Sequence, residues 1–126
     1  MSLNPHSQTP IYIQIAEWLE NEILAHRLVD DGKVYSQYQL AEMFNINPAT
    51  AGKGLTILLE QNILYKKRGL GMFVVENAKE KILATRRTHT LTQLVEGIVQ
   101  EARRLAVSDE ELIALIKQVQ QKGEVE

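Results

Sequence analysis

Three consecutive cations, Lys66, Lys67 and Arg68, form the densest group of positive charge in this sequence. Two glycines follow closely, at Gly69 and Gly71, and ammonium and guanidinium groups bind phosphate oxygens. Exposed cations are more often merely solvated, so an ordinary charged turn is the alternative interpretation. The elements around the cluster must decide between these two interpretations.

The sequence offers little for catalysis. His6, His26 and His89 are scattered, no serine sits in a strand-to-helix elbow, and no carboxylate pair stands with another catalytic group. The absence of cysteine removes thiol chemistry, disulfides and cysteine-bound zinc. His26 with Asp30 and Asp31 could suggest a metal site, but a helix end followed by a turn explains them better. We therefore expect neither an enzyme nor a bound cofactor.

The composition is that of a soluble globular protein. The chain has 126 residues, of which 44% are hydrophobic and 24% charged, enough for one domain or a small domain with an appendage. No apolar run approaches the ~20 residues of a membrane span, and the start lacks the pattern of a signal peptide. We expect a cytoplasmic protein without a membrane partner. The net charge of −2 argues against coating nucleic acid by bulk charge and leaves local basic patches open.

The first predicted helix begins at Thr9 and Pro10. A hydroxyl cap followed by proline at the first helical position is a typical helix start. We expect this helix to end near His26. Its apolar residues recur at helical spacing, and they are Ile13, Ala16, Leu19, Ile23 and Leu24.

Two more helix starts follow. Ser36 is expected to cap a short helix, which the sequence FNIN ends. Asn47 and Pro48 repeat the cap-and-proline start and open a helix to Glu60, with Asn62 as its left-handed terminator. One face of that helix is apolar and includes Ala51, Leu55 and Leu58.

The spacing of apolar residues then changes from helical to alternating. Residues 63–67 and 72–75 read as two short strands, joined by the turn that contains Gly69 and Gly71. Three helices followed by a basic hairpin predict a winged helix-turn-helix. In such a fold one helix enters the major groove of DNA while the hairpin follows the backbone or the adjacent minor groove.

The last 50 residues predict two amphipathic helices. The first starts near Asn77 or Lys79, and a capping box from Ser108 to Glu111 opens the second. Two such helices bury their apolar faces poorly on their own, so we expect them to pack on a partner subunit. The predicted interface residues are Leu91, Leu94, Val95, Ile98, Ala102, Leu105, Leu112, Ile116 and Val119.

Three stretches together carry a family resemblance. TPIYIQIAEWLENEIL, YSQYQLAEMFNINPATAGKGLTILLEQNIL and YKKRGLGMFVVE, in this order and spacing, resemble the N-terminal DNA-binding domain of GntR-family bacterial transcription regulators over about residues 9–76. The opening P-x-Y-x-Q-I most closely resembles the YtrA-like subgroup, whose members carry a short helical C-terminal segment. The resemblance implies a homodimeric repressor that binds an inverted-repeat operator, with residues 77–121 as the dimerisation segment and as the site of any small-molecule effector.

The predicted DNA contacts come from three places. The start of the short helix, the face of the helix at 48–61 opposite its apolar residues, and the hairpin all reach toward DNA in this fold. The contacts are Ser36, Gln37, Tyr38, Asn47, Ala49, Thr50, Gly52, Lys53, Lys66, Lys67, Arg68 and Gly69. Because side chains alternate along a strand, at most one of Lys66 and Lys67 should point fully at DNA.

This chain departs from the family at several contact positions. Many members carry arginine where Tyr38 stands, and Arg-Arg or Ala-Arg where Gly52 and Lys53 stand. Gly52 either lets the backbone approach the groove or marks an altered readout of the bases. Gly54 is expected to pack closely against the preceding helix. In the wing, Leu70 replaces a residue that is often basic, and it either inserts into a minor groove or rests on the surface.

Two expectations remain open. Phe73 is expected to lie in the core.

The main alternative function is a winged helix that binds protein or RNA, which the net acidity and the missing arginines favour slightly and the GntR-like pattern opposes. The salt dependence of binding to duplex DNA distinguishes the two functions, since a DNA binder loses affinity steeply between about 50 and 200 mM salt.

Overall fold

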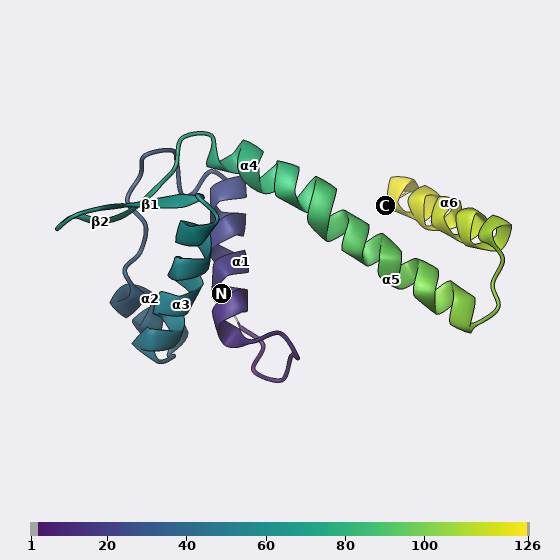
Figure 1. Ribbon diagram of the computed structural model, residues 1–126, viewed down its shortest axis with the longest axis horizontal. Coiled ribbons are helices and arrows are strands. Elements are labelled where there is room, and N and C mark those ends of the chain that lie inside the picture. Colours follow the sequence, from purple (N-terminus) through teal and green to yellow (C-terminus); the bar gives the residue numbers. More distant parts are fainter. Residues whose placement is uncertain (1–2, 126) are drawn as a thin grey trace. The chain divides into compact units, whose positions relative to one another are not determined.

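The computed structural model describes residues 3–125 (Figure 1). The chain forms two compact units, the first running through Ala84 and the second starting at Thr85. It is mainly helical with one two-stranded antiparallel sheet, as predicted. The elements in order are α1 (Ile11–Leu24), α2 (Gln37–Phe44), α3 (Pro48–Glu60), β1 (Leu64–Lys67), β2 (Gly71–Val74), α4 (Ala78–Thr85), the π-helix η1 (Arg86–Thr90), α5 (Leu91–Arg104) and α6 (Asp109–Val125).

Helix α1 starts differently from the prediction. Pro10, not Thr9, is the N-cap residue, and no side chain caps the helix. The reason lies in the backbone: Pro10 is still extended, with ψ at 149°, while its carbonyl already accepts the amides of Ile13 and Gln14. The carboxamide of Gln14 instead donates to the carbonyl of Thr9, at 2.9 Å, which fixes the entering chain.

The starts of α2 and α3 are confirmed. The Ser36 hydroxyl accepts the Gln39 amide at 3.1 Å while the Gln39 side chain accepts the Ser36 amide, a complete capping box. Asn47 caps α3 by accepting the Ala49 amide at 2.8 Å, and Pro48 occupies the first turn. Asn62 has a φ of 60° just beyond α3, so it is the left-handed terminator that was expected.

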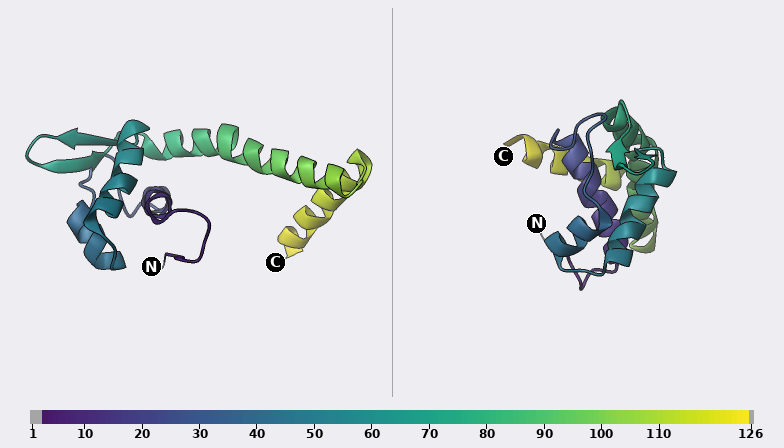
Figure 2. Two further views of the ribbon diagram at one scale, coloured as in Figure 1. Left: turned by 60° about the horizontal axis from the view of Figure 1, so that its bottom comes forward. Right: turned by 90° about the vertical axis from the view of Figure 1, so that its left-hand side faces the viewer.

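The core of the first unit lies where α1, α3 and the hairpin meet. Helix α3 packs against both α1 and α2, and the hairpin extends away from the three helices (Figures 1 and 2). Ile15 and Leu19 from α1, Leu58 from α3 and Val74 from β2 are fully buried. Ile82 of α4 is also buried in this core, which explains why the first compact unit includes α4.

Gly54 lets α1 and α3 approach closely. A Cβ at this position would lie 2.7 Å from Cγ2 of Ile15 and 2.9 Å from the carbonyl oxygen of Tyr12. The close packing was predicted, but its partner was not: the neighbour is α1, not the preceding helix α2. The reason is that Gly54 belongs to the face of α3 that carries Leu55 and Leu58, and that face covers α1.

We expect Gly54→Ala to destabilise the first unit. Overpacking costs about 1–3 kcal/mol, against a gain of about 1 kcal/mol from the helix propensity of alanine. Here one of the clashing atoms belongs to the backbone and cannot rotate away. Thermal and urea unfolding should show a lower Tm and a lower free energy of unfolding.

Gly97 provides the matched control. It lies in α5, and a Cβ built there would meet no atom within 4 Å. Gly97→Ala should therefore raise the free energy of unfolding by about 0.5–1 kcal/mol. Equal stabilisation by the two alanines would contradict the close approach at Gly54.

The hairpin has an inner and an outer face. Leu64 pairs with Val74 on the inner face, and Tyr65 pairs with Phe73 on the outer one. The prediction of Phe73 in the core is therefore wrong: Phe73 is half-buried and stacks on Tyr65, with ring centroids 5.9 Å apart. Alternation along β2 sends Met72 to the core instead.

The second unit holds α5 and α6, which run back from their connecting turn as two diverging helices (Figures 1 and 2). The predicted capping box is present, with the Glu111 amide donating to the Ser108 hydroxyl at 3.1 Å. The helix predicted from residue 77 or 79 is interrupted by η1, in which the amide of Leu91 bonds the carbonyl of Arg86. Three β-branched threonines in residues 85–90 lower the preference of this stretch for α-helix.

Candidate nucleic-acid interface

The three DNA contacts predicted at the start of α2 differ in how far they are exposed to solvent. Ser36 is exposed, and its hydroxyl accepts the amide of Gln39 in the cap. Gln37 is half-buried against α3, whereas Tyr38 is 69% exposed and points its phenol into solvent. A helix start with free amides and an exposed hydroxyl donor can hold a phosphate group.

Helix α3 turns its polar side outward. Asn47, Ala49 and Lys53 are exposed, while Thr50 and Gly52 are half-buried beside them. This is the side opposite Ala51, Leu55 and Leu58, so the predicted faces of the helix are confirmed. An exposed helix face with a small residue, a hydroxyl and a cation is suited to lie in a major groove.

A shallow groove of about 510 Å³ runs along this face, where α1, α2 and α3 meet. Its lining includes Tyr12 of α1 and Gln37 of α2, and the α3 residues Ala49, Gly52, Lys53, Thr56 and Ile57. Tyr12 was not predicted as part of the site. It stands in the P-x-Y-x-Q-I motif, but nothing in the sequence indicates that its ring reaches α3.

The ring of Tyr12 contacts Lys53, the one cation of α3. The Nζ of Lys53 lies 5.6 Å from the centroid of the Tyr12 ring, within cation–π range. A Cβ at Gly54 would lie 2.9 Å from the carbonyl oxygen of Tyr12, so α1 and α3 lie close together at this level. The ring contact joins the solvent-facing charge of α3 to α1 across this close approach.

The wing, which is the β1–β2 hairpin, carries Lys66 and Lys67 on opposite faces. Lys67 lies over the outer-face rings, with Nζ 4.4 Å from the centroid of Phe73 and 5.7 Å from that of Tyr65. Lys66 pairs with Met72 and points to the other face, as strand alternation predicted. A further cation, Lys33, was not predicted as part of the site. Its backbone forms an isolated antiparallel β-bridge with Phe73, and this bridge places another positive charge beside the hairpin.

The tip of the wing is open to solvent. Arg68, Gly69 and Leu70 are all exposed, and Leu70 is exposed over 60% of its surface. Gly69 and Gly71 have φ of 78° and 110°, a backbone region that other residues enter at a cost. The tight turn therefore depends on glycine at both positions and carries Arg68 outward at its start.

Tyr65 ties the wing to the preceding loop. Its hydroxyl donates to Oδ1 of Asp31 at 2.8 Å, and the Asp31 amide donates to the carbonyl of Val74. The hydrogen bond to the Asp31 carboxylate raises the pKa of Tyr65 above its usual value, because it favours the protonated phenol. These bonds fix the base of the hairpin on which the cations stand.

None of the predicted DNA-contacting cations forms an ion pair within residues 3–125. Ion pairs in this part of the chain lie elsewhere, for example between Arg27 and Glu22 and between Arg104 and Glu101. The four cations Lys53, Lys66, Lys67 and Arg68 are exposed and carry no carboxylate partner in this part of the chain. Their charge is free to meet phosphate.

The residues suggested as a metal site each have another partner. Nε2 of His26 lies 3.1 Å from Nζ of Lys79, Oδ2 of Asp30 accepts the Asn77 amide at 3.0 Å, and Asp31 accepts Tyr65. In the described part of the chain no three histidine, aspartate or glutamate side chains gather to hold a metal ion. No helix between residues 3 and 125 is both long and apolar enough to cross a membrane.

The second unit exposes the predicted interface residues. Each of the following is more than 40% exposed: Leu91, Leu94, Val95 and Ile98 of α5, Leu105 just after it, and Ile116 and Val119 of α6. Ala102 is buried and Leu112 is half-buried within the monomer. The structure adds Ile113 and Leu115 to the exposed apolar residues.

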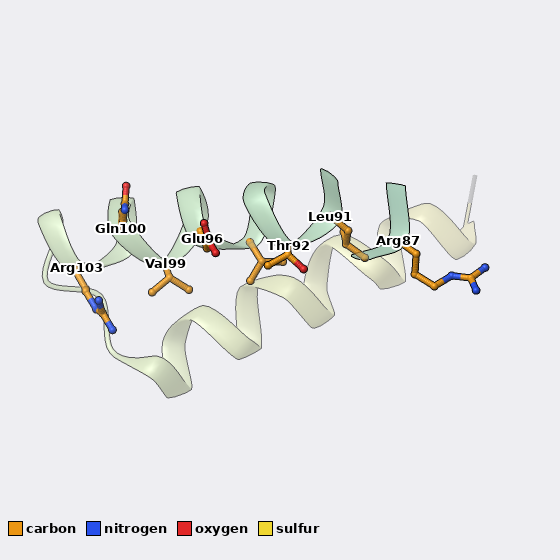
Figure 3. Close-up of a pocket in the computed structure, with 8 residues that line it drawn as sticks. Arg87, Leu91, Thr92, Glu96, Val99, Gln100 and Arg103 are labelled. Atoms are coloured by element: carbon orange, nitrogen blue, oxygen red, sulfur yellow. The ribbon is translucent and has the colours of Figure 1, made fainter. Parts of the chain in front are cut away.

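A groove of about 440 Å³ runs along one flank of η1 and α5. Val95 and Val99 are among its apolar lining residues. Arg87 and Arg103 stand at its two ends (Figure 3). No residue type in the sequence marks this groove, because each lining residue is ordinary for an amphipathic helix. The groove adjoins the exposed apolar stripe.

Comparisons with known proteins agree with these features. No family model matches the chain. The chain is 30% identical over 119 residues to the HTH-type transcriptional repressor YtrA of Bacillus subtilis, covering 94% of this chain and 91% of that protein. It is 32% identical over 120 residues to the HTH-type transcriptional repressor NagR of the same organism, covering 92% of this chain but only 49% of NagR. The chain thus spans about half the length of NagR.

Solved structures give the same result. A GntR family transcriptional regulator from Listeria monocytogenes is 29% identical, with a TM-score of 0.71 over 89% of this chain and 96% of that one. The DNA-binding domain of AraR, solved in complex with operator ORX1, is 27% identical, with a TM-score of 0.54 over 60% of this chain and 93% of that one.

Proposed function

This chain belongs to the GntR family of transcription regulators, in its YtrA-like subgroup, and from that premise we propose that it is a homodimeric repressor of an inverted-repeat operator. It is a DNA-binding regulator of transcription. The observation that best supports the proposal is a set of exposed cations that have no carboxylate partner among the described residues, Lys53 on α3 and residues 66–68 on the wing.

Each subunit would place α3 in a major groove. Asn47, Ala49, Thr50 and Lys53 then face base edges, where lysine reaches O6 or N7 of guanine as a single charge without the planar fork of arginine. Ser36 and Tyr38 at the start of α2 would contact phosphate.

The wing would lie beside this groove and follow the backbone. Arg68 and Lys67 stand on the exposed side of the hairpin, Lys67 against its two rings, and both would neutralise phosphate charge. Lys66 points to the other face and would contribute less. Gly69 allows the tip to approach DNA closely because it has no side chain.

The second unit would form the dimer interface. Its apolar side chains are exposed in the monomer, and contiguous exposed apolar surface of this kind marks interaction sites. Two subunits related by a two-fold axis fit an operator whose half-sites lie about 34 Å, one helical turn, apart. Residues 9–76 are the proposed DNA-binding domain and residues 77–121 the proposed dimerisation segment. An effector would act by favouring one separation of the DNA-binding units over another.

Selection of bound sequences from a random duplex pool tests the function. We expect the full chain to enrich an inverted repeat, and its affinity for that duplex to fall steeply between about 50 and 200 mM salt. A shuffled duplex of the same composition is the control, because it keeps the phosphates and loses the sequence. If nothing is enriched, the proposal fails and binding of protein or RNA becomes the better explanation of the fold.

A further inference from the structure

The missing side chain of Gly52 leaves a space that Gln37 enters. A Cβ at position 52 would lie 3.0 Å from Oε1 of Gln37 and 3.5 Å from its Cδ. The carboxamide of Gln37 thus lies across the outer face of α3, although Gln37 belongs to α2. An alanine at position 52 would push this carboxamide by a few tenths of an ångström, and a long side chain there would have to displace it.

The carboxamide of Gln37 is available to a ligand. Within the described residues no hydrogen bond engages it, whereas the neighbouring Gln39 is fully used in the capping box. It offers two N–H donors and one carbonyl acceptor at the wall of the groove. A glutamine side chain with these free groups can pair with adenine, donating to N7 and accepting from N6.

The rest of the groove is suited to a methyl group. Ala49 and the flat backbone of Gly52 line it beside Gln37. The Thr56 hydroxyl donates to the carbonyl of Gly52 at 2.9 Å, so it is occupied within the helix and its methyl group remains for contact. The only methyl group in the major groove is that of thymine, which small apolar side chains recognise.

We propose that Gln37, lying over Gly52, reads an A·T base pair in each half-site, with adenine on the carboxamide and the thymine methyl group against Ala49 and Thr56. This inference rests on the proposed function and specifies what the recognition surface selects. An arginine at position 52 would fill the same space and favour guanine. Gly52 therefore sets the base preference, because the absence of a side chain leaves room for the Gln37 carboxamide.

The test uses the operator selected by the full-length wild-type chain. Each base pair of the half-site is replaced singly, and binding is measured by fluorescence anisotropy for wild type and for Gln37→Ala. We expect one A·T pair at which wild type discriminates by about 5- to 150-fold and Gln37→Ala hardly discriminates. Gln61→Ala, the same truncation at the exposed end of α3, should keep the wild-type preference.

Base analogues at that pair separate the two halves of the contact. Replacing adenine by 7-deazaadenine removes N7 and should weaken wild type by about 3- to 10-fold without affecting Gln37→Ala. Replacing thymine by deoxyuridine removes the methyl group and should weaken both proteins, because Ala49 and Thr56 remain. Gly52→Arg should shift the preference at this pair from A·T to G·C.

The outcomes are distinguishable. A uniform loss of affinity in Gln37→Ala across all sequences would make Gln37 a phosphate contact and overturn the inference. An unchanged preference in both Gln37→Ala and Gly52→Arg would also overturn it, while leaving the regulator function intact. If the wild-type chain enriches no sequence at all, the proposed function itself fails.

Discussion

Replacing Lys53 and Arg68 together by alanine should weaken operator binding by about 1,000-fold. Four contacts disappear from a dimer, and at about 1 kcal/mol each they amount to about 4 kcal/mol. The slope of log affinity against log salt should become shallower by about 2, because the two Arg68 side chains of the dimer no longer neutralise phosphates. Titrations of a labelled operator duplex at several salt concentrations measure both quantities.

The double variant should fold normally. Both side chains are exposed and have no carboxylate partner within residues 3–125, so their removal costs the fold little. The contact of Lys53 with Tyr12 is worth about 0.5–1 kcal/mol at an exposed site, so Tm should fall by a few degrees at most.

The matched control removes the same charge elsewhere. Lys117 and Lys122 are exposed on α6, outside the proposed DNA surface. Lys117→Ala with Lys122→Ala should leave operator affinity nearly unchanged. If this control weakens binding as much as the test variant, overall charge determines binding and the assigned contacts are wrong.

Placing aspartate at Ile98 and Ile116 should abolish the dimer. Both side chains are over 40% exposed, so the monomer should tolerate the change, whereas four carboxylates, two from each subunit, buried in an apolar interface are strongly unfavourable. Sedimentation should show a monomer. Operator affinity should fall by about 100-fold or more, because the two half-sites are no longer bound by one particle.

Gln93 and Gln121 give the corresponding control. They stand opposite the apolar stripes of α5 and α6 and are exposed. Gln93→Asp with Gln121→Asp adds the same charge and should remain dimeric. A dimer that survives aspartate at Ile98 and Ile116 would refute the proposed interface. A chain ending at Glu76 is a poorer test, since it would lose Ala78 and Ile82 from the core of the first unit.

Local sequence signals predicted the framework well. Ser36 with Gln39 and Asn47 with Pro48 place helix starts through contacts within a few residues, and such contacts depend little on the rest of the fold. The hairpin followed from alternation and from Gly69 and Gly71. The fold class could therefore be derived from these local patterns alone.

Contacts between distant segments could not be predicted in the same way. The placement of Gln37 over Gly52 and of Tyr12 against Lys53 depends on the distances between helices, which no spacing in the sequence encodes. Phe73 was wrongly expected in the core, since hydrophobicity alone does not tell which face of a two-stranded sheet is covered. The π-helix η1 was missed because the apolar spacing on which the helix prediction rests begins only at Leu91, so residues 86–90 were assigned by continuity.

The exposed apolar side chains of α5 and α6 have a consequence for gene dosage. If only the paired chain binds the operator, the active species forms by mass action from two copies. At concentrations well below the dimer dissociation constant, its amount follows the square of the chain concentration, so halving synthesis lowers it about fourfold. Repression would then end abruptly as cells dilute the protein, without any ligand.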